Sequence, residues 1–135
     1  MDVDRAVRVA ESLLPGDGPI TEETDPRWQT IRAIGECVQE EPEAVWEFVR
    51  RWGGDREETL RHAVAVCLLQ ELLAQHFDSH FKQTVRLVRE NKNFADTFAR
   101  CARYGQCELP GNAEAFEEMQ EFAARFRVPG PRLAR

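Results

Sequence analysis

The sequence lacks any apolar run of the ~18–20 residues needed to cross a bilayer. Its first residues, MDVDRAVRVAESLL, are charged and amphipathic and contain no uninterrupted apolar block of the kind found in secretory signals. Glycine and proline are few, with eight and seven residues in 135, which excludes a disordered chain. We therefore expect one globular domain, since domains commonly span roughly 100–200 residues, and we expect it to be cytoplasmic and not to bind a membrane.

Signatures of catalysis are also missing. The only serines are Ser12 and Ser79, and neither lies in a Gly-x-Ser-x-Gly motif. The sequence has no glycine-rich loop of the form that binds phosphate. We therefore predict that the chain is not an enzyme and requires no cofactor.

One pair of histidines has the spacing of metal ligands. His76 and His80 lie at i, i+4, which places two imidazoles on one helix face, and Cys101 and Cys107 are conceivable partners. Asp78 lies between the histidines and is suited to cap a new helix, which would separate them. Because the sequence also contains neither HExxH nor CxxC, we expect no metal site.

The four cysteines are expected to remain unpaired. Cys37, Cys67 and Cys101 fall on apolar helical stripes, where a thiol behaves as a small hydrophobic group, and Cys107 falls in an expected turn. Nothing in the sequence indicates secretion into an oxidising compartment.

Apolar residues recur at three- and four-residue spacing along almost the whole chain, which predicts an all-α fold. We expect seven helices with short connections, so that neighbours run antiparallel. After a helix formed by the first 14 residues, we expect a linker at 15–24, helix pairs over 25–127 and a flexible tail at 128–135. After the linker, we expect helices to start at Asp25–Pro26, at Pro42, at a capping box of Asp55 and Glu58, at Asp78 after a break at 75–79, and at Asn112. We expect the helix that holds Phe94 and Phe98 to continue to Gly105.

The segment at 55–74 is expected to be the central helix of the fold. It carries one apolar stripe of Leu60, Val64, Cys67, Leu68 and Leu72 and a second of Val66, Leu69 and Leu73. A helix that is apolar on two faces is buried between neighbours. Gly35 lies inside another apolar stripe, where glycine costs roughly 1 kcal/mol relative to alanine, so we expect a neighbouring helix to pack closely against it.

Two stretches look like copies of one helix-pair unit. They are DPRWQTIRAIGECVQEEPEAVWEFVRRWGG and DREETLRHAVAVCLLQELLAQHFDSHFKQTVRLVREN. Each opens with Asp and has a Cys near the end of its first apolar stripe. The inward residues of the second helices match in spacing, so that Val45, Phe48, Val49 and Trp52 correspond to Phe81, Thr84, Val85 and Val88. Repetition at this period is typical of helical arrays, in which each unit buries its apolar face against the next.

The pattern resembles HEAT or armadillo-type repeats over residues 25–127. Arg32-Ala33-Ile34 and Arg61-His62-Ala63-Val64 are similar to the Arg-x-x-Ala/Val pattern of the inner HEAT helix. The resemblance implies a short right-handed superhelix with an extended concave surface for a partner. The alternative is an orthogonal helical bundle whose helices look alike because all are amphipathic.

Charge is unevenly distributed along the chain, whose net charge is −6. Residues 1–80 carry 17 acidic and eight basic side chains, whereas residues 81–107 carry two acidic and six basic ones. In helical segments, converging Arg and Lys side chains can hold phosphate or carboxylate groups. The candidate residues, which we call the basic stripe, are Lys82, Arg86 and Arg89 on one helix and Arg100 and Arg103 on the next.

The leading functional hypothesis is a non-enzymatic module that binds another protein through one face of the helical stack. The alternative is binding of nucleic acid or a phosphate ligand through the basic stripe, which the negative net charge disfavours. A solvated helix face also explains the stripe, and the sequence leaves the oligomeric state open.

Overall fold

The computed structural model describes residues 2–14, 16 and 18–128, and every regular element within them is helical, which confirms the expected all-α class. No helix in these ranges is long and apolar enough to cross a membrane. The elements are α1 (Val3–Leu13), α2 (Pro26–Gly35), α3 (Pro42–Trp52), α4 (Glu58–Val64), the π-helical segment η1 (Ala65–Leu69), α5 (Gln70–Gln75), α6 (Phe77–Glu90), α7 (Lys92–Ala99), the 3-10 segment η2 (Gly105–Glu108), α8 (Asn112–Ala123) and the 3-10 segment η3 (Ala124–Phe126).

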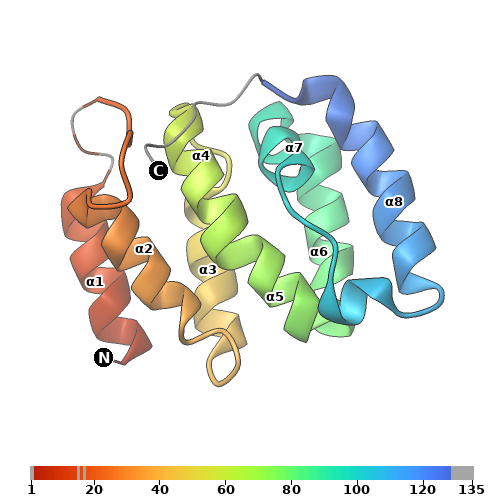
Figure 1. Cartoon of the computed structure of the whole chain (residues 1–135), viewed down its shortest axis with the longest axis horizontal. Helices are drawn as coiled ribbons and strands as arrows, with labels where there is room; N and C mark the ends of the chain where they lie inside the picture. The colour runs from red at the N-terminus through yellow and green to blue at the C-terminus, as the bar shows by residue number, and fades with distance from the viewer. Residues whose placement is uncertain (1, 15, 17, 129–135) are drawn as a thin grey trace.

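The helices form two layers, and one long helix lies in the front layer of Figure 1. α4, η1 and α5 follow one another without interruption, and we call this long helix the central helix. In Figure 1, α2 lies beside the central helix, α3 and α6 lie behind them, and α8 lies at the opposite end of the molecule from α1. Successive helices run in opposite directions, with α2 and the central helix descending and α3 and α6 ascending in this view. The expected antiparallel neighbours are therefore present.

Two helices begin where local capping chemistry predicts. The Asp25 carboxylate accepts a hydrogen bond from the Arg27 N–H at 2.8 Å, and Pro26 occupies the first turn of α2. Pro42 likewise opens α3, where its missing N–H leaves no donor unsatisfied.

The expected capping box at the start of α4 is wrong. The residue before α4 is Glu57, whose carboxylate accepts from the Thr59 N–H at 3.2 Å. Asp55 lies further out and accepts from the Glu57 N–H at 3.0 Å, so it positions the cap without forming it. Glu58 is the first residue of the helix.

Three other boundaries differ from the expected ones. The break near 75–79 is present, but the residue between α5 and α6 is His76, and Asp78 lies in the first turn of α6. α8 is preceded by Gly111, whose φ of 87° favours glycine, and Asn112 is its first residue and not its cap. α7 ends at Ala99, several residues before the expected end.

The central helix is buried as predicted, except at two residues. Leu60, Val64 and Leu72 are at most 1% exposed. Val66 and Cys67, which were expected to face neighbours, are only partly buried. The π-helical turn at this point inserts one residue, which rotates the rest of the helix by about 100° and moves these two side chains out of the apolar stripe.

α2 meets the central helix through a glycine. A Cβ atom built on Gly35 would lie 2.4 Å from the backbone oxygen of Cys67, which is closer than real Cβ contacts. The two backbones can approach this far only because Gly35 has no side chain. The expected close packing at Gly35 is therefore confirmed, and its neighbour is the π-helical segment.

Parts of the expected linker and tail are packed against the helices. Ile20 is 1% exposed, and its N–H donates to the Thr59 hydroxyl at 2.7 Å. At the other end, the Val128 N–H donates to Asp96 at 2.8 Å, so Val128 belongs to the folded body. Residues 15 and 17 of the expected linker and 129–135 of the expected tail lie outside the described residues.

Replacing Gly35 by Ala tests the close contact between α2 and the central helix. In an exposed helix this change stabilises by roughly 1 kcal/mol. Here we expect it to lower the free energy of unfolding by about 1–3 kcal/mol, because the new methyl group overlaps the Cys67 carbonyl. Urea denaturation measures the change, with the exposed Gln83→Ala as control, expected within about 0.5 kcal/mol of the parent. A stabilised Gly35→Ala protein would contradict the contact.

Candidate functional site

The five residues of the basic stripe do not form one surface. Lys82, Arg86 and Arg89 are exposed along α6, as expected for one helix face. Arg100 and Arg103 follow the end of α7 and have different environments from α6 and from each other. The predicted stripe is thus reduced to three residues.

Arg100 is buried and structural, which corrects its assignment as a binding residue. Its side chain is 0% exposed, and its Nε donates to Oδ2 of Asp96 at 3.0 Å. Arg61 donates to the same oxygen through Nε at 3.1 Å and through a terminal nitrogen at 2.9 Å. Glu58, whose side chain is 35% exposed, lies 3.7 Å from Arg100 at the edge of this cluster, and we call Glu58, Arg61, Asp96 and Arg100 the buried charge network. A buried charge is stable only when it is paired in this way.

The buried charge network also holds the end of the described chain. Asp96 accepts from the Val128 N–H, and Arg100 donates to the Val128 carbonyl at 3.1 Å. Arg100 also lies 3.4 Å from Nδ1 of His62, which must accept because a guanidinium has only donors. Burial and the positive charge of Arg100 lower the pKa of His62. His62 is therefore neutral near neutral pH.

Arg103 is exposed, but its charge is neutralised by two carboxylates. Its Nε lies 3.0 Å from Glu108, and a terminal nitrogen lies 3.4 Å from Glu117 on α8. It therefore contributes little positive potential to the surface of α6.

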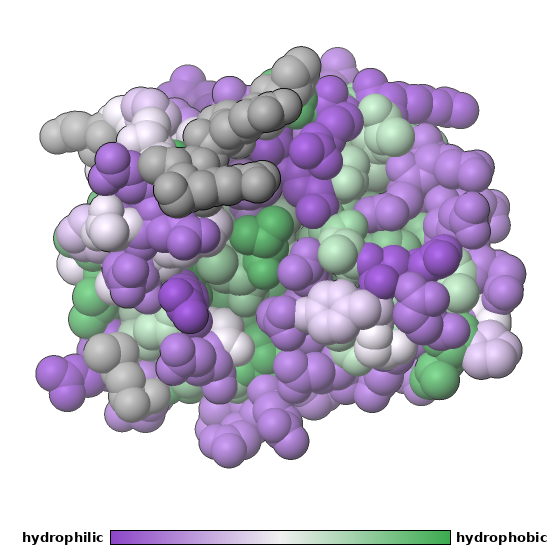
Figure 2. Space-filling view, viewed as in Figure 1, coloured by the Kyte–Doolittle hydropathy of each residue, from purple (hydrophilic) through white to green (hydrophobic). Residues whose placement is uncertain are grey.

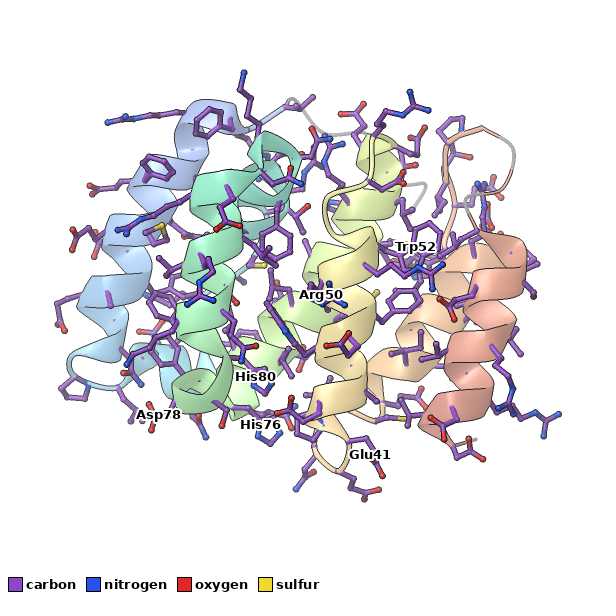
Figure 3. The ribbon with its side chains drawn as sticks, turned by 180° about the vertical axis from the view of Figure 1, so that it is seen from behind. Glu41, Arg50, Trp52, His76, Asp78 and His80 are labelled. Carbon is purple, nitrogen blue, oxygen red and sulfur yellow. The ribbon has the colours of Figure 1, made fainter. Side chains whose placement is uncertain are left out.

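Arg86 of the basic stripe lines a groove between α3 and α6. This α3–α6 groove has a volume of about 320 Å³. Arg50 and Arg86 line it from opposite sides, and Glu43 and Glu47 lie on its α3 side. Figure 3 shows Arg50 on the face of the molecule that is seen from behind. Because two carboxylates accompany the two guanidinium groups, the groove has no net charge of its own. The complete lining is Glu43, Trp46, Glu47, Arg50, Gln83, Arg86 and Leu87.

His76 and His80 lie near each other but do not build a metal site. Their ring centroids are 6.3 Å apart, and Nε2 of His76 donates to the Val38 carbonyl at 3.0 Å. His80, labelled beside His76 in Figure 3, is fully buried; its ring centroid lies 5.7 Å from that of Trp46, and its Nε2 lies 3.3 Å from the carboxylate of Glu43. Within residues 2–14, 16 and 18–128, no three His, Cys, Asp or Glu side chains are placed to share a metal ion.

A second groove lies on the opposite face, between α2 and the π-helical segment. This α2–η1 groove has a volume of about 470 Å³. Val66 and Cys67 form its floor together with Gly35, at the point where the backbones of α2 and the central helix touch. Figure 2 shows apolar side chains at the bottom of a hollow near the centre of this face, with hydrophilic residues on both sides. The rest of the lining consists of Trp28 and the charged residues Glu23, Arg32, Glu36 and Glu71.

The α5 wall of the α2–η1 groove is braced by the segment that follows α7. Ala102 donates its N–H to the side-chain oxygen of Gln70 at 2.8 Å, which fixes this segment against the central helix. The Tyr104 hydroxyl donates to the carboxylate of Glu71. Burial and this hydrogen bond raise the pKa of Tyr104, so its hydroxyl keeps its proton. The Glu71 side chain is therefore held in place on the wall of the groove by Tyr104.

The thiol on the floor of the α2–η1 groove is not activated. Burial raises the pKa of Cys67 to about 12, and the nearby Arg32 only partly opposes this effect. Since the thiolate is the nucleophilic form, Cys67 behaves as an apolar contact near neutral pH. Cys101 and Cys107 are buried free thiols whose pKa values burial also raises.

Sequence reasoning missed both the buried charge network and the α2–η1 groove. A signal for the network was present in the sequence. Asp96 and Arg100 lie at i, i+4 between the core residues of NFADTFARC, and these apolar neighbours favour a buried ion pair over two exposed charges. The groove depends on a π-helical turn, which shifts the apolar periodicity and has no residue signature in the sequence.

The contrast between Arg100 and Arg86 tests the corrected assignments. Arg100→Ala is expected to lower the free energy of unfolding by about 3–5 kcal/mol, because Asp96 loses one partner in a buried site. Arg86→Ala should change it by under about 0.5 kcal/mol, because Arg86 is exposed. Urea denaturation of both variants measures these changes. Equal changes in the free energy of unfolding would show that Arg100 is not part of a buried network.

The lowered pKa of His62 gives a pH dependence with a defined sign. Below about pH 6.5 the unfolded chain protonates this histidine first, since its ordinary pKa is near that value and the folded pKa is lower. Protonation therefore favours the unfolded state, and the free energy of unfolding should decrease as the pH falls below about 6.5. His62→Gln should make this decrease smaller, measured as urea midpoints at about pH 7.5 and about pH 5.5. An unchanged or steeper decrease in the variant would contradict the assignment.

Comparison with known proteins supplies no relative. No protein family matches the chain, and neither a curated protein nor a solved structure matches it.

Proposed function

We propose that this chain is a non-enzymatic protein-binding module that holds a segment of a partner protein in the α2–η1 groove. The observation that carries the proposal is the pair Val66 and Cys67, apolar residues of the central helix that the chain's own helices leave partly uncovered. Specific binding sites commonly combine an apolar floor with a polar rim, and this groove has both.

The rigidity of the groove supports this proposal. Its two walls meet at the contact between Gly35 and the Cys67 carbonyl, and its α5 wall is held by Gln70 and Tyr104. A binding surface that is already ordered loses less conformational entropy on association. We also propose that the two layers of helices form a short HEAT-like array, in which the α2–η1 groove lies between successive units.

The chemistry of the groove favours binding over catalysis. Its thiol is protonated near neutral pH, and the neighbouring His62 is neutral and engaged with Arg100. Cys67, Cys101 and Cys107 are free thiols, which supports a reducing compartment and hence a cytoplasmic location as part of the proposal. Binding of nucleic acid has less support, because only Lys82, Arg86 and Arg89 of the basic stripe remain exposed on α6.

A pair of matched valine variants tests the proposed function. Val66 and Val85 are both partly buried on helix surfaces, and Val66 lines the α2–η1 groove while Val85 lies on α6. Val66→Arg should reduce partner capture roughly tenfold or more, as for a central residue of an interface, because it places a cation on the apolar floor. Val85→Arg should leave capture unchanged. The measurement is affinity capture from the source cells with quantitative mass spectrometry, after both variants are shown to melt like the parent.

Equal capture by the Val66→Arg protein and the parent would remove the α2–η1 groove as the binding site. Loss of capture in Val85→Arg alone would move the site to the face that carries α6.

A further inference from the structure

We propose that the partner segment held in the α2–η1 groove is a basic peptide, with Arg or Lys side chains beside a small apolar residue. This inference rests on the proposed function and specifies the chemistry of the partner. It derives from the charges that surround the floor: three carboxylates, those of Glu23, Glu36 and Glu71, against the single guanidinium of Arg32.

The carboxylates stand on different walls of the groove. Glu36 follows α2 directly, Glu71 lies on α5, and Glu23 precedes α2. A cationic side chain that enters between α2 and the central helix therefore meets a carboxylate on either side. Arg suits this position best, because its planar group carries five donors that can reach two acceptors at once.

The Glu71 carboxylate is already held in position in the absence of a partner. Its carboxylate already accepts the Tyr104 hydroxyl, which limits its rotation and leaves other lone pairs open. A carboxylate that is fixed in this way loses little side-chain entropy when a cation binds.

The floor of the groove determines the size of the apolar side chain that the peptide can carry. Val66 and Cys67 are small, and Gly35 adds no side chain, so the groove can receive a short apolar side chain beside the cation. Trp28 contributes little exposed surface, because it is 6% exposed and stacks on His62.

The charge of the whole chain acts in the same direction. Residues 1–80, which supply the entire lining of this groove, carry 17 acidic and eight basic side chains. The exposed cations of α6 lie on the other layer of the molecule. This negative surplus attracts a basic partner to this part of the chain, and the three carboxylates of the lining direct it to the α2–η1 groove.

Three peptides of equal length test this inference by fluorescence anisotropy with the full-length chain. All three contain the same small apolar residues, and they differ only in carrying Arg, Gln or Glu at the flanking positions. The Arg peptide is expected to bind most tightly, and its affinity should fall as salt rises from about 50 to about 300 mM.

Two double variants separate local recognition from general attraction. Glu36→Gln with Glu71→Gln should weaken the Arg peptide by roughly tenfold, because two charge-assisted contacts are lost. Glu118→Gln with Glu121→Gln changes the net charge equally on the exposed surface of α8 and should have little effect. Equal weakening by both double variants would overturn the inference, since it would reduce the binding to unspecific attraction.

The remaining outcomes distinguish this inference from the proposed function. Tighter binding of the Gln or Glu peptide, lost in Val66→Arg, would overturn the basic partner and keep the groove as a binding site. Binding of the Arg peptide that survives Val66→Arg would place it outside the groove and overturn both. A dimer in sedimentation that Val66→Arg abolishes would assign the groove to a second copy of this chain and overturn the basic peptide.

Discussion

The backbone contact between Gly35 and the carbonyl of Cys67 is the constraint on which the proposed site depends. A side chain at position 35 would hold α2 and the central helix apart, and the α2–η1 groove would lose its shared floor. The groove also depends on the π-helical turn, because this turn rotates Val66 and Cys67 out of the buried stripe and toward the groove. One glycine and one inserted residue thus create an apolar surface between two otherwise ordinary helices.

The buried charge network fixes the α4 end of the central helix through ion pairs. Arg61 and Arg100 share the carboxylate of Asp96, and this carboxylate also fixes the backbone of Val128. A buried network of this kind holds elements in one arrangement, because any shift would leave a charge without a partner. It joins α4, α7 and the last described residue into one body, so the α4 end of the central helix is anchored beyond the groove.

The general fold follows from local patterns, whereas the site does not. Helical periodicity, Pro26, Pro42 and the spacing of Leu60, Val64 and Leu72 were sufficient to predict an all-α chain with a buried central helix. The candidate residue Arg100 was assigned to the surface because residue type alone favours exposure for arginine. Its partner Arg61 comes from another helix, and such a tertiary pairing cannot be read from the spacing within one helix. The exposure of Cys67 was missed for a related reason, since a π-helical turn changes the phase of a stripe without changing its residues.

Charge differs between the two faces of the molecule. The lining of the α2–η1 groove carries three carboxylates and one guanidinium group, whereas Lys82, Arg86 and Arg89 are exposed along α6. Amide chemical-shift mapping of the full chain with its captured partner tests this account most directly. The account predicts shifts confined to α2, η1 and α5, around Glu36, Val66 and Glu71. Shifts centred on Arg50 and Arg86 in the α3–α6 groove, with α2 and η1 unchanged, would contradict it.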